Sequence, residues 1–327
     1  MELKLSKSHI HKISSFHHRE DWLIEFFLSF HSAHTKKSYR IDLEMFFQFL
    51  ADHFPHVLEY QSITRLHVIS YKTLLMQNEM APKTVIRKLA SISSFFDFLM
   101  NKNVLEYNPT DSIKRPRDAV LKPTNDLSDE QVSNLFAQLH ELRDEKLMHK
   151  ALLYTLFTTG LRKSELTQLK WGHIEKVQEH SLFRIKAKGG KVLSKVIHPF
   201  CLDILRELES YQQNSGFEMG PEHFIFRPSK NPTQNGNLNR ALNPKTVDYI
   251  LDLYAKKAGI HTRISPHSAR ATYIGSALES GVDLYKISKD VGHASVKTTE
   301  EYNKRRNLIK DSPVWGIGYL KKDKAAS

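Results

Sequence analysis

The sequence has almost no cysteine and no long apolar run. Cys201 is the only cysteine among 327 residues, which excludes an intramolecular disulfide framework and a cysteine zinc cluster. No apolar stretch reaches the roughly 18 residues that span a bilayer, and the first residues lack the hydrophobic segment of a signal peptide. The 18 histidines are scattered and show no metal-binding pattern with carboxylates. We therefore expect a cytoplasmic protein, with no membrane segment and no metal.

Positive charge exceeds negative charge in both parts of the chain. There are 48 Lys and Arg against 36 Asp and Glu, a formal net charge of +12, to which residues 1–125 contribute +4 and residues 126–327 contribute +8. A basic surface gains affinity for nucleic acid by neutralising phosphates, whatever the base sequence. The excess favours a long polyanion as partner. On charge alone, a solvated basic surface remains the alternative.

Apolar residues recur at helical spacing in the first hundred residues. Residues 22–30, 39–50 and 83–100 each carry a stripe in steps of three and four, which predicts helices with one buried face. Two of these helices begin with cations, where exposed amides suit phosphate. An ordinary charged face is the alternative for each cluster. The residues predicted to contact DNA there are Lys36, Lys37, Arg40, Lys83, Thr84, Arg87 and Lys88.

Helical periodicity stops between Asn108 and Asn125, where three prolines interrupt a basic stretch. A capping box formed by Ser128 and Gln131 then begins a new helix. The predicted organisation is a helical domain over residues 1–107, a linker over 108–125 and a larger domain over 126–327. In the larger domain, β-branched runs at residues 182–185 and 192–197 flank a Gly-rich turn, which predicts a hairpin.

The larger domain contains the side chains that a tyrosine needs to break a DNA strand. A phenol attacks the phosphorus, fixed cations stabilise the charge on the non-bridging oxygens, and an acid protonates the leaving oxygen. Arginine suits the cation's position, since its planar fork donates two hydrogen bonds to phosphate and keeps its charge. In chain order the candidates are Arg162, Lys188, His267, Arg270, His293 and Tyr302.

Spacing along the chain supports this grouping. Arg162 lies just after a glycine break between two helical stretches, and Glu165, three residues on, lies on the same helical face and can orient it as a supporting residue. His267 and Arg270 are also three residues apart, which projects both from one face of a helix.

Together these segments resemble the tyrosine recombinases, the lambda-integrase-like phage integrase family, and especially its compact Xer-like type. That family carries a Thr-Gly-Leu-Arg-x-x-Glu-Leu segment, a hairpin lysine, His-x-x-Arg, Gly-His and a tyrosine nine residues after the histidine. The resemblance makes Tyr302 the nucleophile, with Arg162 and Arg270 on the scissile phosphate. Lys188 becomes the general acid for the leaving oxygen.

The resemblance gives the two histidines supporting roles. His267 is expected to act as base or phosphate ligand, and His293 to hydrogen-bond the phosphate. Two departures stand out. Ala269 and Ala271 replace the Leu and His that the family often has, which affects local packing. Lys191 flanks the same glycines as Lys188 and remains the alternative general acid.

The resemblance also implies the fold and the reaction. The fold is mainly α: a helical core-binding (SAM-like) domain and a mainly helical catalytic domain with a small antiparallel β-sheet, forming a clamp on DNA. The reaction is site-specific recombination through a 3′-phosphotyrosyl intermediate and a Holliday junction. The expected partners are double-stranded DNA with specific sites, three further copies in a homo-tetramer and accessory proteins. The tail residues Trp315, Ile317 and Tyr319 are expected to dock on a neighbouring protomer.

Neither a metal nor a nucleotide cofactor is implied, because the arginines take the metal's electrostatic role. Two alternatives remain: a type IB topoisomerase that relaxes DNA as a monomer, and a catalytically silent DNA-binding regulator on the same fold. The helical first domain argues against the topoisomerase, and the complete set of candidates argues against the regulator. The sequence specifies neither the target site nor the biological task.

Overall fold

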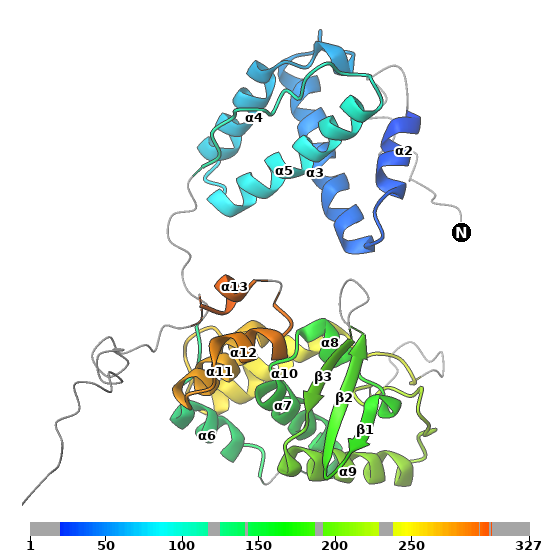
Figure 1. Ribbon diagram of the computed structural model, residues 1–327, viewed down its shortest axis with the longest axis vertical. Coiled ribbons are helices and arrows are strands. Elements are labelled where there is room, and N and C mark those ends of the chain that lie inside the picture. The colour runs from blue at the N-terminus through cyan, green and yellow to red at the C-terminus, as the bar shows by residue number, and fades with distance from the viewer. Residues whose placement is uncertain are drawn as a thin grey trace, which may run out of the picture. The chain divides into compact units, whose positions relative to one another are not determined.

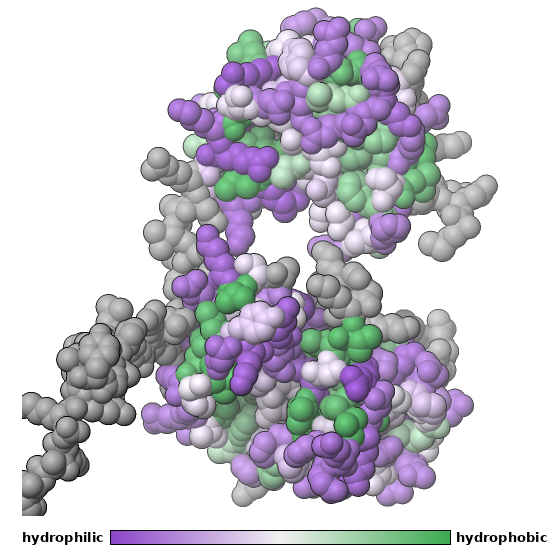
Figure 2. All heavy atoms as spheres, viewed as in Figure 1, coloured by the Kyte–Doolittle hydropathy of each residue, from purple (hydrophilic) through white to green (hydrophobic). Residues whose placement is uncertain are grey.

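A computed structural model describes residues 20–116, 125–140, 143–186, 192–228, 238–293, 295–300 and 302. The chain divides into two compact units, Met1–Leu121 and Lys122–Ser327, each with its own hydrophobic core. Figure 1 shows the helices of the first unit and the mixed helices and strands of the second. On the face seen in Figure 2, hydrophilic residues cover much of each unit, with apolar patches between them.

The described part of the first unit is built from helices. Its elements are α2 (Glu20–Leu28), α3 (Ala33–His53), the short 3-10 helix η1 (Tyr60–Ser62), α4 (Arg65–Gln77) and α5 (Pro82–Asn101). The three apolar stripes predicted helices that correspond to α2, α3 and α5, whereas α4 was not predicted. Local signals begin two of these helices: the Ser32 hydroxyl accepts from the Thr35 amide at 3.3 Å, and Pro82 occupies the first turn of α5.

Aromatic rings fill the core of the first unit. Phe47 of α3 meets Phe95 of α5 edge to face, with ring centroids 6.0 Å apart, and Tyr71 of α4 meets Phe46 at 5.2 Å. Edge-to-face pairs add stabilisation beyond the area that the rings bury. Helices α3, α4 and α5 are therefore held together through one aromatic core.

A buried ionic group also joins α3 to α5. The carboxylate of Asp42, which is fully buried, accepts from both terminal nitrogens of Arg87, from the Lys88 ammonium at 3.1 Å and from the Ser91 hydroxyl at 2.8 Å. We call these four residues the Asp42 cluster. Buried charges persist in folded proteins when they are paired and hydrogen-bonded, as this carboxylate is. The Lys88 side chain is only 4% exposed, so its ammonium is paired with Asp42 inside the unit and does not face solvent.

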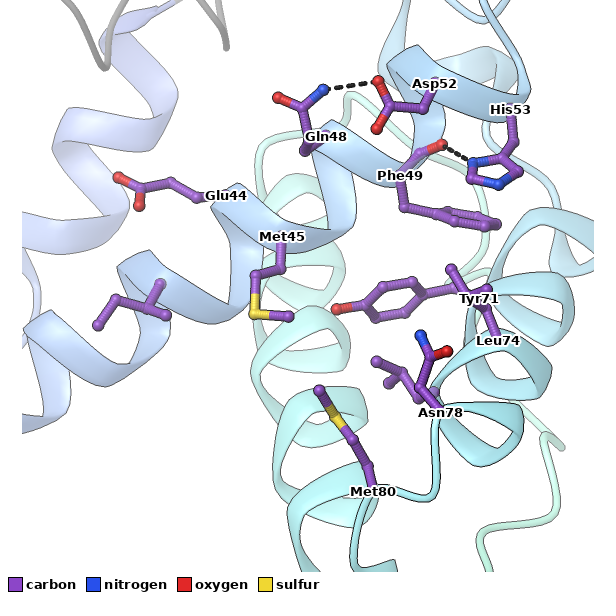
Figure 3. A pocket seen from close by; sticks show the side chains of 12 residues that line it. Glu44, Met45, Gln48, Phe49, Asp52, His53, Tyr71, Leu74, Asn78 and Met80 are labelled. Atoms are coloured by element: carbon purple, nitrogen blue, oxygen red, sulfur yellow. Dashed lines mark hydrogen bonds between the residues drawn. The ribbon is translucent and has the colours of Figure 1, made fainter.

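An apolar cavity of about 390 Å³ opens between α3 and α4 of the first unit. Figure 3 shows Phe49 of α3 packed beside Tyr71 of α4, with ring centroids 5.2 Å apart, and two methionines along the wall of the cavity. The polar contacts drawn there are internal to α3, from Gln48 to Asp52 at 2.7 Å and from the His53 ring to the Phe49 carbonyl at 3.1 Å. The described lining of this cavity includes none of the six catalytic candidates.

The second unit is mainly helical. In chain order its elements are α6 (Asp129–Ala137), η2 (Asp144–Lys146), α7 (Leu147–Thr159), α8 (Lys163–Thr167), η3 (Trp171–His173), β1 (Ile174–Val177), β2 (His180–Lys186), β3 (Val192–Val196), α9 (Pro199–Asn214), α10 (Pro244–Lys257), α11 (Pro266–Glu279), α12 (Leu284–Asp290) and α13 (Val296–Glu300). The predicted capping box forms at α6, where the side chains of Ser128 and Gln131 each accept from the other's backbone amide. Helix α7 is buried along most of its length and packs against α9, α10 and α11.

The three strands form one antiparallel sheet in the order β1-β2-β3. The predicted hairpin is confirmed as β2 and β3, and the prediction of a mainly helical fold with a small antiparallel sheet is correct. Strand β1 was missed, because it has four residues and is mostly exposed. In β3 the side chains alternate, with Leu193 and Lys195 buried and Val192, Ser194 and Val196 exposed.

Cys201 lies fully buried in α9, with its sulfur 3.6 Å from the Thr155 hydroxyl. Burial raises the pKa of this thiol. Among the described residues, no helix combines the length and apolar content needed to cross a bilayer.

Candidate active site

The first arginine follows a sharp break between two helices. Helix α7 ends at Thr159, and Gly160 turns the chain with a φ of +59°; a Cβ at Gly160 would lie 2.5 Å from the Tyr273 ring, so the position requires glycine. The Arg162 amide then donates to Glu165 Oε2 at 2.8 Å, and its guanidinium donates to Glu165 Oε1 at 2.8 Å and to the Gly292 carbonyl at 3.0 Å. The contact expected between Arg162 and Glu165 is thus present, and it orients the guanidinium.

The second arginine, Arg270 of α11, is 2% exposed and is held by two carbonyl groups. One Nη donates to the Gly160 carbonyl at 2.7 Å, and the other donates to the Val291 carbonyl. Burial, followed by the charge of Arg162, lowers the pKa of Arg270 to about 10, so it stays cationic at neutral pH. Because neutral carbonyls fix its orientation without cancelling its charge, the site carries a buried cation that favours an anionic ligand.

The tyrosine hydroxyl is hydrogen-bonded to a histidine. Tyr302 Oη lies 2.9 Å from Nε2 of His267, which is exposed on α11. The Tyr302 ring is 8% exposed, packs with apolar residues such as Ile274 and Val291, and lies nearly parallel to the His293 ring at a centroid distance of 5.9 Å. A neutral imidazole nitrogen at this distance can accept the phenolic proton. This geometry suits an oxygen nucleophile paired with a base.

The second histidine is neutral at physiological pH. Burial, followed by the charges of Arg270 and Arg162, lowers the pKa of His293 to about 4. Its Nδ1 lies 2.8 Å from the Thr299 hydroxyl. When this hydroxyl donates to Nδ1, the ring proton is on Nε2, which makes that nitrogen a donor for an oxygen ligand.

These contacts bring together five of the six catalytic candidates: Arg162, His267, Arg270, His293 and Tyr302. Lys188 and its alternative Lys191 lie outside the described residues, as do the tail residues Trp315, Ile317 and Tyr319. The two departures from the family pattern, Ala269 and Ala271, are both buried and pack in the apolar cores of this unit.

The predicted DNA-contacting residues belong to the first unit, and their burial differs. Lys37, Lys83 and Arg87 are exposed, whereas Lys36, Arg40 and Thr84 are partly buried. Lys88 differs from both groups, because its side chain is buried and its ammonium forms an ion pair with Asp42. Contacts of these residues with DNA stay predictions.

Three residues beside the site were missed by the sequence analysis. The buried Lys195 ammonium pairs with Asp290, and the Tyr273 hydroxyl donates to the same carboxylate at 2.9 Å. One signal was available for Lys195. The alternation of β3 places it on the same side as Leu193, so a lysine stands where the strand pattern calls for an apolar residue. Among the residues that the structure describes, no group of three or more His, Cys, Asp or Glu is arranged to hold a metal ion.

Comparisons with known proteins cover most of the chain. Residues 125–307 match the phage integrase family, and residues 22–103 match the phage integrase N-terminal SAM-like domain. The tyrosine recombinase XerC of Halalkalibacterium halodurans is 30% identical over 283 residues, covering 83% of this chain and 87% of that protein. The XerC of Roseiflexus sp. (strain RS-1) is 29% identical over 287 residues, covering 86% of this chain and 87% of that protein.

Solved structures share the fold. The XerH site-specific recombinase bound to palindromic difH substrate, in a post-cleavage complex, matches with a TM-score of 0.70 at 17% identity, covering 86% of this chain and 80% of that one. A lambda integrase dimer bound to a COC′ core site matches with a TM-score of 0.63 at 14% identity, covering 88% and 95%.

Proposed function

The chain belongs to the phage integrase family, the tyrosine recombinases, and we propose that it is a site-specific DNA recombinase with Tyr302 as its nucleophile. One observation carries the proposal: the 2.9 Å hydrogen bond between the Tyr302 hydroxyl and His267, formed next to two arginines. A nucleophile bonded to a base, beside fixed cations, is the arrangement that phosphodiester cleavage requires.

The proposed step transfers the phosphodiester from DNA to the enzyme. Tyr302 Oη attacks the phosphorus and gives its proton to His267 Nε2, while the bond from phosphorus to the 5′-oxygen breaks. The products are a 3′-phosphotyrosyl bond and a free 5′-hydroxyl, whose proton comes from Lys188, with Lys191 as the alternative. The covalent bond conserves the energy needed to rejoin a strand.

Three side chains stabilise the charge that develops on the non-bridging oxygens. Arg270 offers a guanidinium already fixed by carbonyls, and Arg162 offers one oriented by Glu165. The neutral His293 ring donates from Nε2. Because these groups are in place before the reaction, no reorganisation is needed when the charge forms.

Strand exchange requires several copies. We propose a homo-tetramer on two DNA sites that exchanges strands in pairs through a Holliday junction. One fold relative, a lambda integrase, was solved as a tetramer bound to a Holliday junction, with a TM-score of 0.62 at 14% identity. In this proposal the domains over residues 1–107 and 126–327 both bind the duplex, joined by the linker over 108–125, and the tail docks on a neighbouring protomer. The reaction takes place in the cytoplasm.

The test begins by selecting the binding site from a random duplex library with Tyr302→Phe, which keeps the ring but cannot attack. A nicked duplex carrying the selected site then traps the covalent intermediate. We expect a denaturation-resistant protein–DNA adduct with the wild-type chain and none with Tyr302→Phe, although both bind the site equally. A missing wild-type adduct, or one that survives Tyr302→Phe, would refute the proposal. Relaxation of a plasmid that lacks the site would contradict its specificity.

A further inference from the structure

Three side chains next to the site form a polar group that the proposed chemistry does not use. The ammonium of Lys195, in β3, pairs with the carboxylate of Asp290 at the end of α12, and it lies 4.9 Å from the ring centre of Tyr273, in α11. The Tyr273 hydroxyl donates to the same carboxylate at 2.9 Å. We call these three residues the Asp290 brace. It joins strand β3 to two helices of the site.

The brace is attached to the peptide groups that hold the arginines. Asp290 is followed directly by Val291 and Gly292, whose carbonyls accept from Arg270 and Arg162. The other carbonyl partner of Arg270 belongs to Gly160, and the Tyr273 ring lies so close there that a Cβ would be 2.5 Å from it. A movement of Asp290 or Tyr273 therefore moves the acceptors that set the guanidinium directions.

Packing alone does not account for a lysine at position 195. Its side chain is 1% exposed, and burial lowers its pKa while the Asp290 carboxylate opposes that shift. Leu193, on the same side of β3, fills an equivalent inward position with an apolar side chain. A buried ion pair is seldom more stabilising than apolar residues of similar volume, so stability is a weak reason for a charge at this position.

We propose that Lys195, Tyr273 and Asp290 are positioning residues that hold the carbonyls of Gly160, Val291 and Gly292, and through them aim both arginines at the scissile phosphate. Lys195 acts through Asp290, and Tyr273 acts through both Asp290 and Gly160. Groups that orient a catalytic side chain often matter to the rate nearly as much as the side chain itself. This inference rests on the proposed function.

The experiment separates cleavage from binding. Single-turnover adduct formation is measured on saturating nicked site for Lys195→Met, Asp290→Asn and the double variant, while affinity is measured with each change in the Tyr302→Phe chain. We expect each single change to slow cleavage by roughly 10- to 100-fold while the Kd stays within about threefold, since misaimed guanidinium groups affect the transition state more than the bound state. The double variant should cleave no more slowly than the slower single variant, because Lys195 acts through Asp290.

A matched control separates positioning from loss of stability. Arg227 is another buried cation of this unit, 3% exposed, and it donates to the Glu218 carbonyl at 2.9 Å and to Gln212 Oε1 at 3.0 Å. Arg227→Met should lower the melting temperature but leave the cleavage rate of the folded protein unchanged. Tyr273→Phe removes only a hydroxyl, so it should stay folded and slow cleavage several-fold even if Asp290→Asn unfolds.

Three results would overturn the inference: a wild-type rate in Asp290→Asn or in Tyr273→Phe, single effects that multiply in the double variant, or an equal loss of rate in Arg227→Met. These results differ from a failure of the proposed function, in which the wild-type chain itself forms no adduct that depends on Tyr302.

Discussion

The two units use arginine nitrogens in opposite ways. In the first unit, Arg87 gives both terminal nitrogens to the Asp42 carboxylate, so its charge is matched by an anion of the protein. In the second, Arg270 gives its terminal nitrogens to two carbonyl oxygens, which direct it without matching its charge. The difference teaches that an arginine paired with a carboxylate ties helices together, whereas one held by neutral carbonyls keeps a charge that can attract a phosphate.

Each unit also contains a buried ion that is paired with opposite charge. Asp42 is an anion that receives three cationic or hydroxyl donors, whereas Lys195 is a cation that has one carboxylate. We expect the Asp42 cluster to affect the stability of the first unit. We expect the charges of Arg270 and Lys195 to affect the reaction. Three experiments test this division.

The largest effect is expected from Arg270→Met, which removes the cation held by two neutral carbonyls. Adduct formation should fall by about 10³- to 10⁵-fold, the range found when an arginine that stabilises a transferring phosphoryl group is lost. The measurement is the single-turnover rate on a saturating nicked site. Arg227→Met is the control, since Arg227 is also held by neutral oxygens but its hydrogen bonds are not with site residues. Equal losses of cleavage rate in Arg270→Met and Arg227→Met would contradict the role given to the charge of Arg270.

A smaller effect is expected from Asp42→Asn, which leaves the buried Lys88 ammonium without a carboxylate. The free energy of unfolding of the first unit should fall by about 3–5 kcal/mol, as when one partner of a buried pair is removed. Amide hydrogen exchange in α3 and α5 measures it.

Glu25→Gln breaks the exposed pair with Lys102 in the same unit and serves as the control, with an expected loss below about 1 kcal/mol. Asp42→Asn would contradict this expectation if it lowered the free energy of unfolding no more than Glu25→Gln does. A slower cleavage step at saturating DNA would also contradict it, because the Asp42 cluster is expected to act on stability and not on the reaction.

The smallest effect concerns protonation of His293. Its pKa is about 4 in the folded chain against an ordinary value of 6.5, so the unfolded chain takes up the proton first as the pH falls. This residue's contribution to stability is therefore complete above about pH 6.5 and is lost between that value and about pH 4. His293→Gln should reduce the drop in melting temperature between pH 7 and pH 5. His149, whose pKa burial also lowers to about 4, stays in both proteins, so the difference reports on His293. Equal drops would show that burial and the nearby arginines do not lower the pKa of His293.

Local features of the fold could be predicted because their physics is local. A stripe of apolar residues identified α3 and α5, a serine three residues before a glutamine identified the start of α6, and two β-branched runs around glycines identified β2 and β3. Motif order along the chain also selected Arg162, Arg270 and Tyr302, which the fold brings together. Their catalytic roles remain predictions.

Partners that are far apart in the sequence could not be predicted. Lys88 was predicted to contact phosphate, but it points to Asp42 because α5 packs against α3, 46 residues earlier. Lys195 and Asp290 are 95 residues apart and meet only because β3 lies against α12. The alternation of β3 indicates that Lys195 faces inward, but no local pattern identifies the partner of either lysine. Tertiary packing alone decides those partners.

The burial of Cys201 makes this chain convenient for spectroscopy. A fully buried thiol with a raised pKa reacts slowly with alkylating labels, because the thiolate is the reactive form. The wild-type chain can therefore receive one new cysteine in each unit, for example at the exposed Leu58 and Tyr249, without first removing its own. A donor and acceptor dye at those positions would follow the approach of the two units on a DNA site in real time.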